Sequence, residues 1–190
     1  MAIFVTVSAF LVVACSGGST GALSSTDKDS EQAAPVKSVK SDRKPAADFE
    51  LVLFGNGEHQ RGEKIRLSQF AGQPVVLNFW FPSCPPCVAE MPDLEKAYQK
   101  FKPEGVQFIG VQLLGLDTVQ DGQEFVDDIG VNYMIGADQT EDSSGDIVRE
   151  YEVRGFPTTV FIDSDQLIAR SWSGVLNLEK LEELIAGILN

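Results

Sequence analysis

Histidine and cysteine are scarce in this chain. Its 190 residues include one histidine, His59, and three cysteines, Cys15, Cys84 and Cys87. A structural zinc site takes four ligands, usually cysteine and histidine, and these four side chains are scattered between positions 15 and 87. One short loop closed by Cys84 and Cys87 is also too little to serve as the disulfide framework of so long a chain. The sequence therefore predicts neither a zinc-stabilised nor a disulfide-stapled domain.

Basic residues are also few. The chain has 15 Lys and Arg against 28 Asp and Glu, which gives a net charge of −13. A protein that binds nucleic acid by neutralising phosphates is excluded by this balance, and adsorption to anionic lipid is disfavoured. Apolar residues make up 43% and charged residues 23% of the chain, so a packed core is expected. The length suits one domain with appendages.

No apolar run is long enough to span a membrane, which takes about 20 residues. The longest, at 1–14, carries no charge and fits the apolar region of a secretory signal, although the Lys or Arg expected at the start of a signal is absent. The alternative is a buried helix, but no cap or amphipathic pattern accompanies the run. We therefore expect residues 1–14 to be a signal peptide.

The residues around Cys15, Val12-Val13-Ala14-Cys15-Ser16, resemble the lipobox of a bacterial lipoprotein. This resemblance implies cleavage before Cys15 and a diacylglycerol on its sulfur. Residues 16–46 are rich in small and polar side chains and cannot bury enough surface to order themselves. The prediction is a lipidated cysteine and flexible linker at 15–46, followed by a globular domain at 47–190. A disordered tail without a lipid is the alternative for the linker.

Strand and helix patterns alternate along the globular part. Apolar alternation or continuous apolar runs predict strands at 48–54, 65–67, 75–80, 106–114, 133–135, 158–163 and 168–172. Apolar residues at helical spacing predict helices at 84–101, 118–130, 147–151 and 178–188, the last capped by Asn177, and Ser68 is expected to cap a short helical turn. This order predicts a three-layer α/β domain.

The segment Cys84-Pro85-Pro86-Cys87 lies where a buried strand is expected to run into a helix. A thiolate is the nucleophile in disulfide exchange, and a helix N-terminus favours the anion. Prolines suit the first helical turn, where their missing N–H groups cost little. We therefore expect Cys84 to attack and Cys87, deeper in the helix, to resolve the mixed disulfide. Half of a zinc site or a structural pair is the alternative, and its partner ligands are absent.

Four segments resemble thioredoxin-fold proteins, specifically the TlpA/ResA-like family of extracytoplasmic thiol–disulfide oxidoreductases. They are 45–49, Pro-Ala-Ala-Asp-Phe; 72–80, Gly-Gln-Pro-Val-Val-Leu-Asn-Phe-Trp; 84–92, Cys-Pro-Pro-Cys-Val-Ala-Glu-Met-Pro; and 155–163, Gly-Phe-Pro-Thr-Thr-Val-Phe-Ile-Asp. The resemblance implies a central mixed sheet with helices on both faces, and a strand–helix insertion at about 117–138.

The resemblance also implies roles for individual residues. Pro157 matches the cis-proline that faces the dithiol; an edge-strand proline is the alternative. Glu90 matches the family's acidic residue near the buried thiol, where a carboxyl with a raised pKa could accept the proton of Cys87. Its alternative is a solvated helix charge. Asn78 stands where thioredoxin has a buried Asp, which leaves Glu90 as the candidate proton acceptor.

The same comparison of motifs places Trp80, Ser83 and Phe156 at the substrate groove. Trp80 matches the family's aromatic residue before the first cysteine, and core packing explains it equally well. Ser83 stands where relatives often have an aromatic residue, and Phe156 is bulkier than usual, so the groove is expected to differ in shape. Pro92 matches a helix-kinking proline without a chemical role, and His59 is predicted to lie in a loop.

The predicted function is reduction of protein disulfides outside the cytoplasmic membrane by a monomeric, lipid-anchored enzyme. The direction follows from the two prolines between the cysteines: they carry no charge, whereas a histidine there would stabilise the thiolate and make an oxidant. No cofactor beyond the Cys84–Cys87 pair is expected. The resemblance implies disulfide-containing protein substrates, a membrane electron-donor protein and, for some members, cytochrome c maturation.

Two other functions remain as alternatives. A peroxiredoxin-like peroxidase shares the fold, but its signature needs Pro seven and Thr or Ser three residues before the cysteine. Those positions hold Leu77 and Phe81 before Cys84, and Trp80 and Cys84 before Cys87. A copper-binding lipoprotein would use two thiolates, but copper-handling relatives combine a longer cysteine spacing with a histidine.

Overall fold

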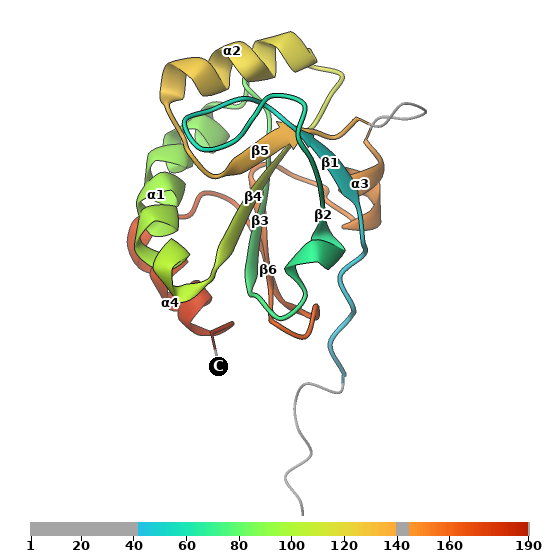
Figure 1. Ribbon diagram of the computed structural model, residues 1–190, viewed down its shortest axis with the longest axis vertical. Helices are drawn as coiled ribbons and strands as arrows, with labels where there is room; N and C mark the ends of the chain where they lie inside the picture. Colours follow the sequence, from blue (N-terminus) through green and yellow to red (C-terminus); the bar gives the residue numbers. More distant parts are fainter. Residues whose placement is uncertain (1–41, 140–144, 190) are drawn as a thin grey trace, which may run out of the picture. The chain divides into compact units, whose positions relative to one another are not determined.

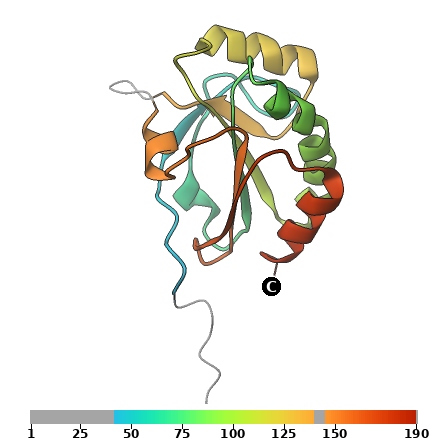
Figure 2. The same ribbon diagram turned by 180° about the vertical axis from the view of Figure 1, so that it is seen from behind.

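The computed structural model describes residues 42–139 and 145–189. This part of the chain forms one seven-stranded sheet with helices on both faces (Figures 1 and 2). The expected three-layer α/β arrangement is confirmed. The predicted signal peptide at 1–14, Cys15 and most of the predicted linker lie outside the described residues.

The elements follow the predicted order, with ends that differ by a few residues. The strands are β1 (Glu50–Leu53), β2 (Lys64–Arg66), β3 (Val75–Trp80), β4 (Gln107–Gln112), β5 (Met134–Ala137), β6 (Thr158–Ile162) and β7 (Ile168–Ser173). The helices are α1 (Pro85–Phe101), α2 (Val119–Ile129), α3 (Asp146–Glu150) and α4 (Leu178–Ala186), with short 3-10 turns η2 (Leu67–Phe70) and η3 (Lys102–Glu104).

The sheet is mixed, in the order β2-β1-β5-β4-β3-β6-β7. Strands β3, β4 and β5 are parallel, and the other neighbours pair antiparallel. The segment 117–138, expected to hold a strand–helix insertion, carries α2 first and β5 second. This order follows from the pairing, because a strand parallel to β4 needs a crossover connection, which α2 supplies.

Strand β3 is buried along its whole length, as its continuous apolar run predicts. Val76 and Trp80 face the core shared with α1 and α4. Val75, Leu77 and Phe79 face the other core, which α3 helps to cover. The central strand thus packs against a core on each face of the sheet. Its carboxyl end leads into α1.

Of two predicted helix caps, one needs correction. The helical turn η2 begins at Leu67, and Ser68 lies inside it rather than capping it. The Ser68 amide and hydroxyl donate to Asp48 instead, while the side chain of Gln69 accepts from the Arg66 amide. The cap of α4 is confirmed: Asn177 Oδ1 accepts from the Lys180 amide at 2.9 Å.

The end of the predicted linker packs on the domain. Arg43 pairs with Asp163 at 2.9 Å, and the amide of Ala46 donates to the carbonyl of Gln166. Pro45 bridges to Leu167. Residues 43–46, which composition alone assigns to the linker, therefore already contact the turn between β6 and β7.

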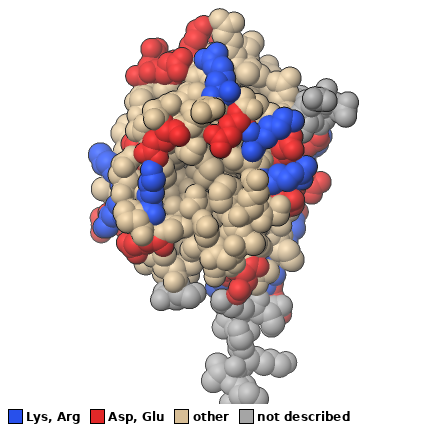
Figure 3. All heavy atoms as spheres, in the orientation of Figure 1, with Lys and Arg blue, Asp and Glu red and all other residues tan. Residues whose placement is uncertain are grey.

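Charge on the face seen in Figure 3 is mixed, with Lys and Arg side chains lying beside acidic ones. Ion pairs of the domain include that of Lys64 with Glu50 at 3.0 Å. Within 42–139 and 145–189, no helix has the length and apolar character that a membrane crossing requires.

Candidate active site

The two cysteines lie where β3 gives way to α1, at the carboxyl end of the parallel strands. They form a disulfide with Cα atoms 5.3 Å apart. Cys84 is the N-cap of α1, and Pro85 and Pro86 open the helix. The amide of Cys87 donates to Cys84 Sγ at 3.3 Å. An otherwise unpaired amide of the first helical turn thus points at the sulfur of Cys84.

The two sulfurs differ in access. Cys84 keeps 4% of its surface exposed and Cys87 none. Pro85 and Pro86, between them, are exposed. An incoming disulfide can therefore reach Cys84 more readily than Cys87, which agrees with the predicted order of attack.

Pro157 follows a cis peptide bond after Phe156, as the resemblance implies. Its carbonyl accepts from the Gly174 amide at 2.9 Å, which ties it to the start of the β7–α4 connection. The ring of Phe156 packs against that of Phe81 with centroids 5.3 Å apart. Since Phe81 lies three residues before Cys84, this contact joins the proline loop to the approach of α1.

Glu90 lies one turn after Cys87 and is buried, with 1% of its surface exposed. The alternative of a solvated helix charge is therefore wrong. Its carboxylate accepts from Asn78 Nδ2 at 2.7 Å and from the Leu176 amide at 2.9 Å. Burial raises the pKa of Glu90 to about 7 even though both hydrogen bonds favour the charged form. A carboxyl with this pKa can both take and return a proton near neutral pH.

Asn78 is held in place from a second side. Its Nδ2 also donates to Thr159 Oγ1 at 3.0 Å, across the pairing of β3 with β6. The side-chain amide of Asn78 is therefore a neutral hydrogen-bond donor to Glu90. The resemblance implies that thioredoxin has a buried Asp at this position.

The predicted groove residues do not all reach the surface. Trp80 is fully buried and packs on Phe125 of α2, with ring centroids 5.3 Å apart. It therefore supports the site from beneath and does not line a groove. Phe156 is half-buried and Ser83 is exposed, so both remain candidates to contact a substrate.

A contact that the sequence analysis missed links Ser83 to Asp117. Asp117 Oδ2 accepts from the Ser83 amide at 3.1 Å and from its hydroxyl at 2.7 Å. Asp117 lies in the connection from β4 to α2, which leaves the same end of the sheet as β3. The sequence offered one indication of this contact: Asp117 follows a predicted strand closely, and Ser83 follows another.

Large apolar side chains are exposed close to these loops. Among the described residues they are Leu116, Val119 and Val175, with Leu116 71% and Val175 49% exposed. Leu116 precedes Asp117, and Val175 precedes Leu176, whose amide binds Glu90. Leu116 and Val175 thus each place an exposed apolar side chain next in sequence to a residue that contacts the site.

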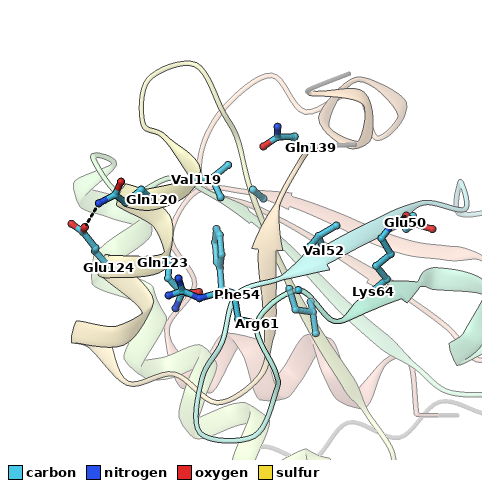
Figure 4. A pocket seen from close by; sticks show the side chains of 13 residues that line it. Glu50, Val52, Phe54, Arg61, Lys64, Val119, Gln120, Gln123, Glu124 and Gln139 are labelled. Carbon is cyan, nitrogen blue, oxygen red and sulfur yellow. Dashed lines mark hydrogen bonds and ion pairs between the residues drawn. The ribbon is translucent and has the colours of Figure 1, made fainter. Parts of the chain in front are cut away.

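A separate cavity of about 970 Å³ lies between α2 and the hairpin of β1 and β2 (Figure 4). Val52, Phe54 and Val119 supply apolar surface, and Gln120 and Glu124 are hydrogen-bonded to each other on its α2 side. None of the predicted site residues lines it. His59 lies in the loop of the same hairpin, as expected for a loop residue.

Comparison with known proteins agrees with this site. Residues 43–171 match the AhpC/TSA family. The chain is 32% identical over 153 residues to the thiol-disulfide oxidoreductase ResA of Oceanobacillus iheyensis, covering 77% of this chain and 76% of ResA. It matches a DsbE thiol:disulfide interchange protein of Chlorobium tepidum with a TM-score of 0.66 and 26% identity, covering 78% of this chain and 97% of that one. It also matches the exposed lipoprotein thioredoxin Etrx1 of Streptococcus pneumoniae, with a TM-score of 0.61, 25% identity and coverages of 74% and 98%.

Fold and dithiol together define a thioredoxin-fold enzyme of thiol–disulfide exchange. The chain belongs to the AhpC/TSA family and, within it, to the ResA-like thiol-disulfide oxidoreductases.

Proposed function

We propose that this oxidoreductase works as a reductase of protein disulfides on the outer side of a membrane, to which it is tethered through Cys15. The observation that carries the proposal is the dithiol at the start of α1, with Cys84 4% exposed, Cys87 fully buried and the buried Glu90 one helical turn after Cys87. Cytochrome c maturation, which the resemblance implies for some members of the family, is one setting in which it could work.

The reaction proceeds in two exchanges. The Cys84 thiolate attacks one sulfur of the substrate disulfide, forms a mixed disulfide and releases the other substrate sulfur as a thiolate. Cys87 gives its proton to Glu90 and attacks Cys84 Sγ. The second substrate thiolate leaves, and the Cys84–Cys87 disulfide of this structure is restored. Two electrons have then passed to the substrate, and a membrane electron-donor protein returns them to the pair.

The surroundings of the dithiol support a polypeptide substrate. Ser83, Pro85 and Pro86, which flank Cys84 in the chain, are exposed, so a large partner can approach them. Leu116 and Val175 offer apolar contacts on two connections at this end of the sheet. Within the described ranges, no group of three or more metal-ligating side chains gathers.

The first prediction concerns the direction of the reaction. With no charged group between the cysteines, the reduction potential should lie nearer that of thioredoxin, about −270 mV, than that of DsbA, about −120 mV. We expect a value below roughly −200 mV. Equilibration with dithiothreitol, read by thiol labelling, measures it. A potential near that of DsbA would mean that the enzyme oxidises its substrates.

Two parallel assays compare the alternative functions. The reduced enzyme should reduce insulin disulfides in turnover with dithiothreitol. A faster reaction with hydrogen peroxide than with insulin would favour a peroxidase. Stoichiometric Cu(I) retention without insulin reduction would favour a copper-binding lipoprotein.

The second prediction concerns the tether. Cys15→Ala should release the protein from the membrane fraction, because a lipid on that sulfur is the proposed anchor. Fractionation followed by mass spectrometry of the N-terminal peptide measures this. Cys84→Ala is the matched control, since it also removes a cysteine but should leave the protein membrane-bound. An unmodified N-terminal peptide in a protein that still sediments with membranes would contradict the prediction.

A further inference from the structure

The residue just before the attacking cysteine is bound to a carboxylate from another part of the chain. Asp117 Oδ2 accepts both the amide and the hydroxyl of Ser83, at 3.1 and 2.7 Å. Helix α1 has no acidic residue in its own first turn. The negative charge at this helix start is therefore supplied by the β4–α2 connection. Two hydrogen bonds to one oxygen hold that charge in place.

The geometry puts this charge close to the reactive sulfur. Consecutive Cα atoms are 3.8 Å apart, so a carboxylate bonded to the Ser83 amide lies within roughly 10 Å of Cys84 Sγ. Both groups lie at the rim of the fold, with Asp117 half-buried and Cys84 slightly exposed. At such a distance a like charge disfavours the formation of a thiolate, although salt screens part of the effect.

Few other charges compete at this position. In the first two turns of α1 after Cys84, the titratable groups are Cys87 and Glu90, both buried. The others on this helix, Asp93, Glu95, Lys96, Tyr98 and Lys100, lie at least nine residues after Cys84. The proline loop, residues 155–158, and the β7–α4 connection, residues 174–177, contain no titratable side chain, and Arg154 flanks the former. Asp117 is thus a charge close to Cys84 that comes from outside α1.

We propose that Asp117 is a positioning residue of the dithiol: held by Ser83, it sets a negative charge beside Cys84 that opposes the helix N-terminus and keeps the pair reducing. Reduction converts a neutral disulfide into the Cys84 thiolate and the Cys87 thiol, taking up two electrons and one proton. A negative charge next to that thiolate disfavours the reduced form, which makes the reduced enzyme a stronger donor of electrons. The proposal rests on Cys84 being the attacking thiol of the proposed function.

The test removes the charge and keeps the acceptor. Asp117→Asn should raise the alkylation rate of Cys84 by iodoacetamide at pH 7 by about two- to tenfold, measured in a Cys87→Ser background that leaves one thiol at the site. In the protein with both cysteines, the equilibrium with dithiothreitol, measured at a pH above the pKa of Cys84 where the reduced form is the thiolate, should move toward the reduced form by a similar factor, and tenfold corresponds to about 30 mV.

Asp121→Asn is the matched control. Asp121 is another carboxylate near the start of α2, but it accepts from Thr118 rather than from Ser83. This variant removes the same charge from the protein and should change neither rate nor equilibrium by as much as twofold. Equal effects from the two variants, or none from Asp117→Asn, would overturn the proposal.

Ser83→Ala tests whether Ser83 holds the charge in place. In the Cys87→Ser background it should raise the alkylation rate of Cys84. When Asp117→Asn is also present it should have no effect, because the two residues act through one contact. Additive effects would overturn the positioning role. The attacking thiol is judged independently by trapping with single-cysteine variants, so failure of this proposal is distinguishable from failure of the proposed function.

Discussion

Cys87→Ser should accumulate covalent complexes with substrate proteins, and Cys84→Ser should not. The attacking sulfur is the N-cap of α1, receives the amide of Cys87 and retains some exposure, whereas the sulfur of Cys87 is fully buried. Exchange passes through a mixed disulfide, and only the second thiol can release it. Without that thiol the complex persists, and multiple turnover should fall to background in both variants.

The measurement is electrophoresis without reductant, followed by identification of the partners after reduction. The matched control is the double variant Cys84→Ser/Cys87→Ser, which should trap nothing. If Cys15 carries the proposed lipid, no third free thiol is left to form other complexes. Complexes that form with Cys84→Ser instead would reverse the assignment of the two cysteines.

The sequence predicts the framework of the domain because its signals are local and strong. The run at 75–80 is apolar at nearly every position and becomes the central strand β3. Asn177 is followed by apolar residues at helical spacing and caps α4. In both segments the local preference for strand or helix agrees with the burial that the fold requires, so tertiary contacts did not alter the predicted secondary structure.

The contacts of the site were less predictable because they join distant segments. The carboxylate of Glu90 binds the amide of Leu176, which is 86 positions away, and Asp117 binds Ser83, which is 34 away. Periodicity carries no information about such pairs. The role of Trp80 was undecided for the same reason, since its burial depends on Phe125 in the segment between β4 and β5.

The pH dependence of stability provides one measure of Glu90. Its pKa is about 7 in the fold, against an ordinary value of 4.5. Between pH 4.5 and about 7, Glu90 is protonated in the folded state and ionised in the unfolded state. The free energy of unfolding is therefore highest below pH 4.5 and falls as the pH rises to about 7. The loss is on the order of 3 kcal/mol. Glu90→Gln should lack this decline, while other buried acids such as Asp138 titrate alike in both proteins.

Glu90→Gln should also slow turnover by about a hundredfold, the lower end of what general acid–base catalysis contributes. The new side chain is of similar size and neutral, but it cannot accept the proton of Cys87. In the parent enzyme the resolution of the mixed disulfide should speed up as pH rises through about 7, because only the ionised carboxylate is a base. The variant should lose this step in its pH profile.

Glu95→Gln is the matched control for the kinetics. Glu95 lies on the same helix, and its carboxylate binds the amide and side chain of Asn132, at 2.8 and 2.9 Å, away from the dithiol. This variant alters the contact with Asn132 and should keep the parent pH profile. Stopped-flow measurement of the resolution step from pH 5 to pH 9 compares the three proteins. If Glu90→Gln resolves the mixed disulfide at the parent rate at every pH, Glu90 does not take the proton, and its burial serves only to connect α1 to the β7–α4 loop.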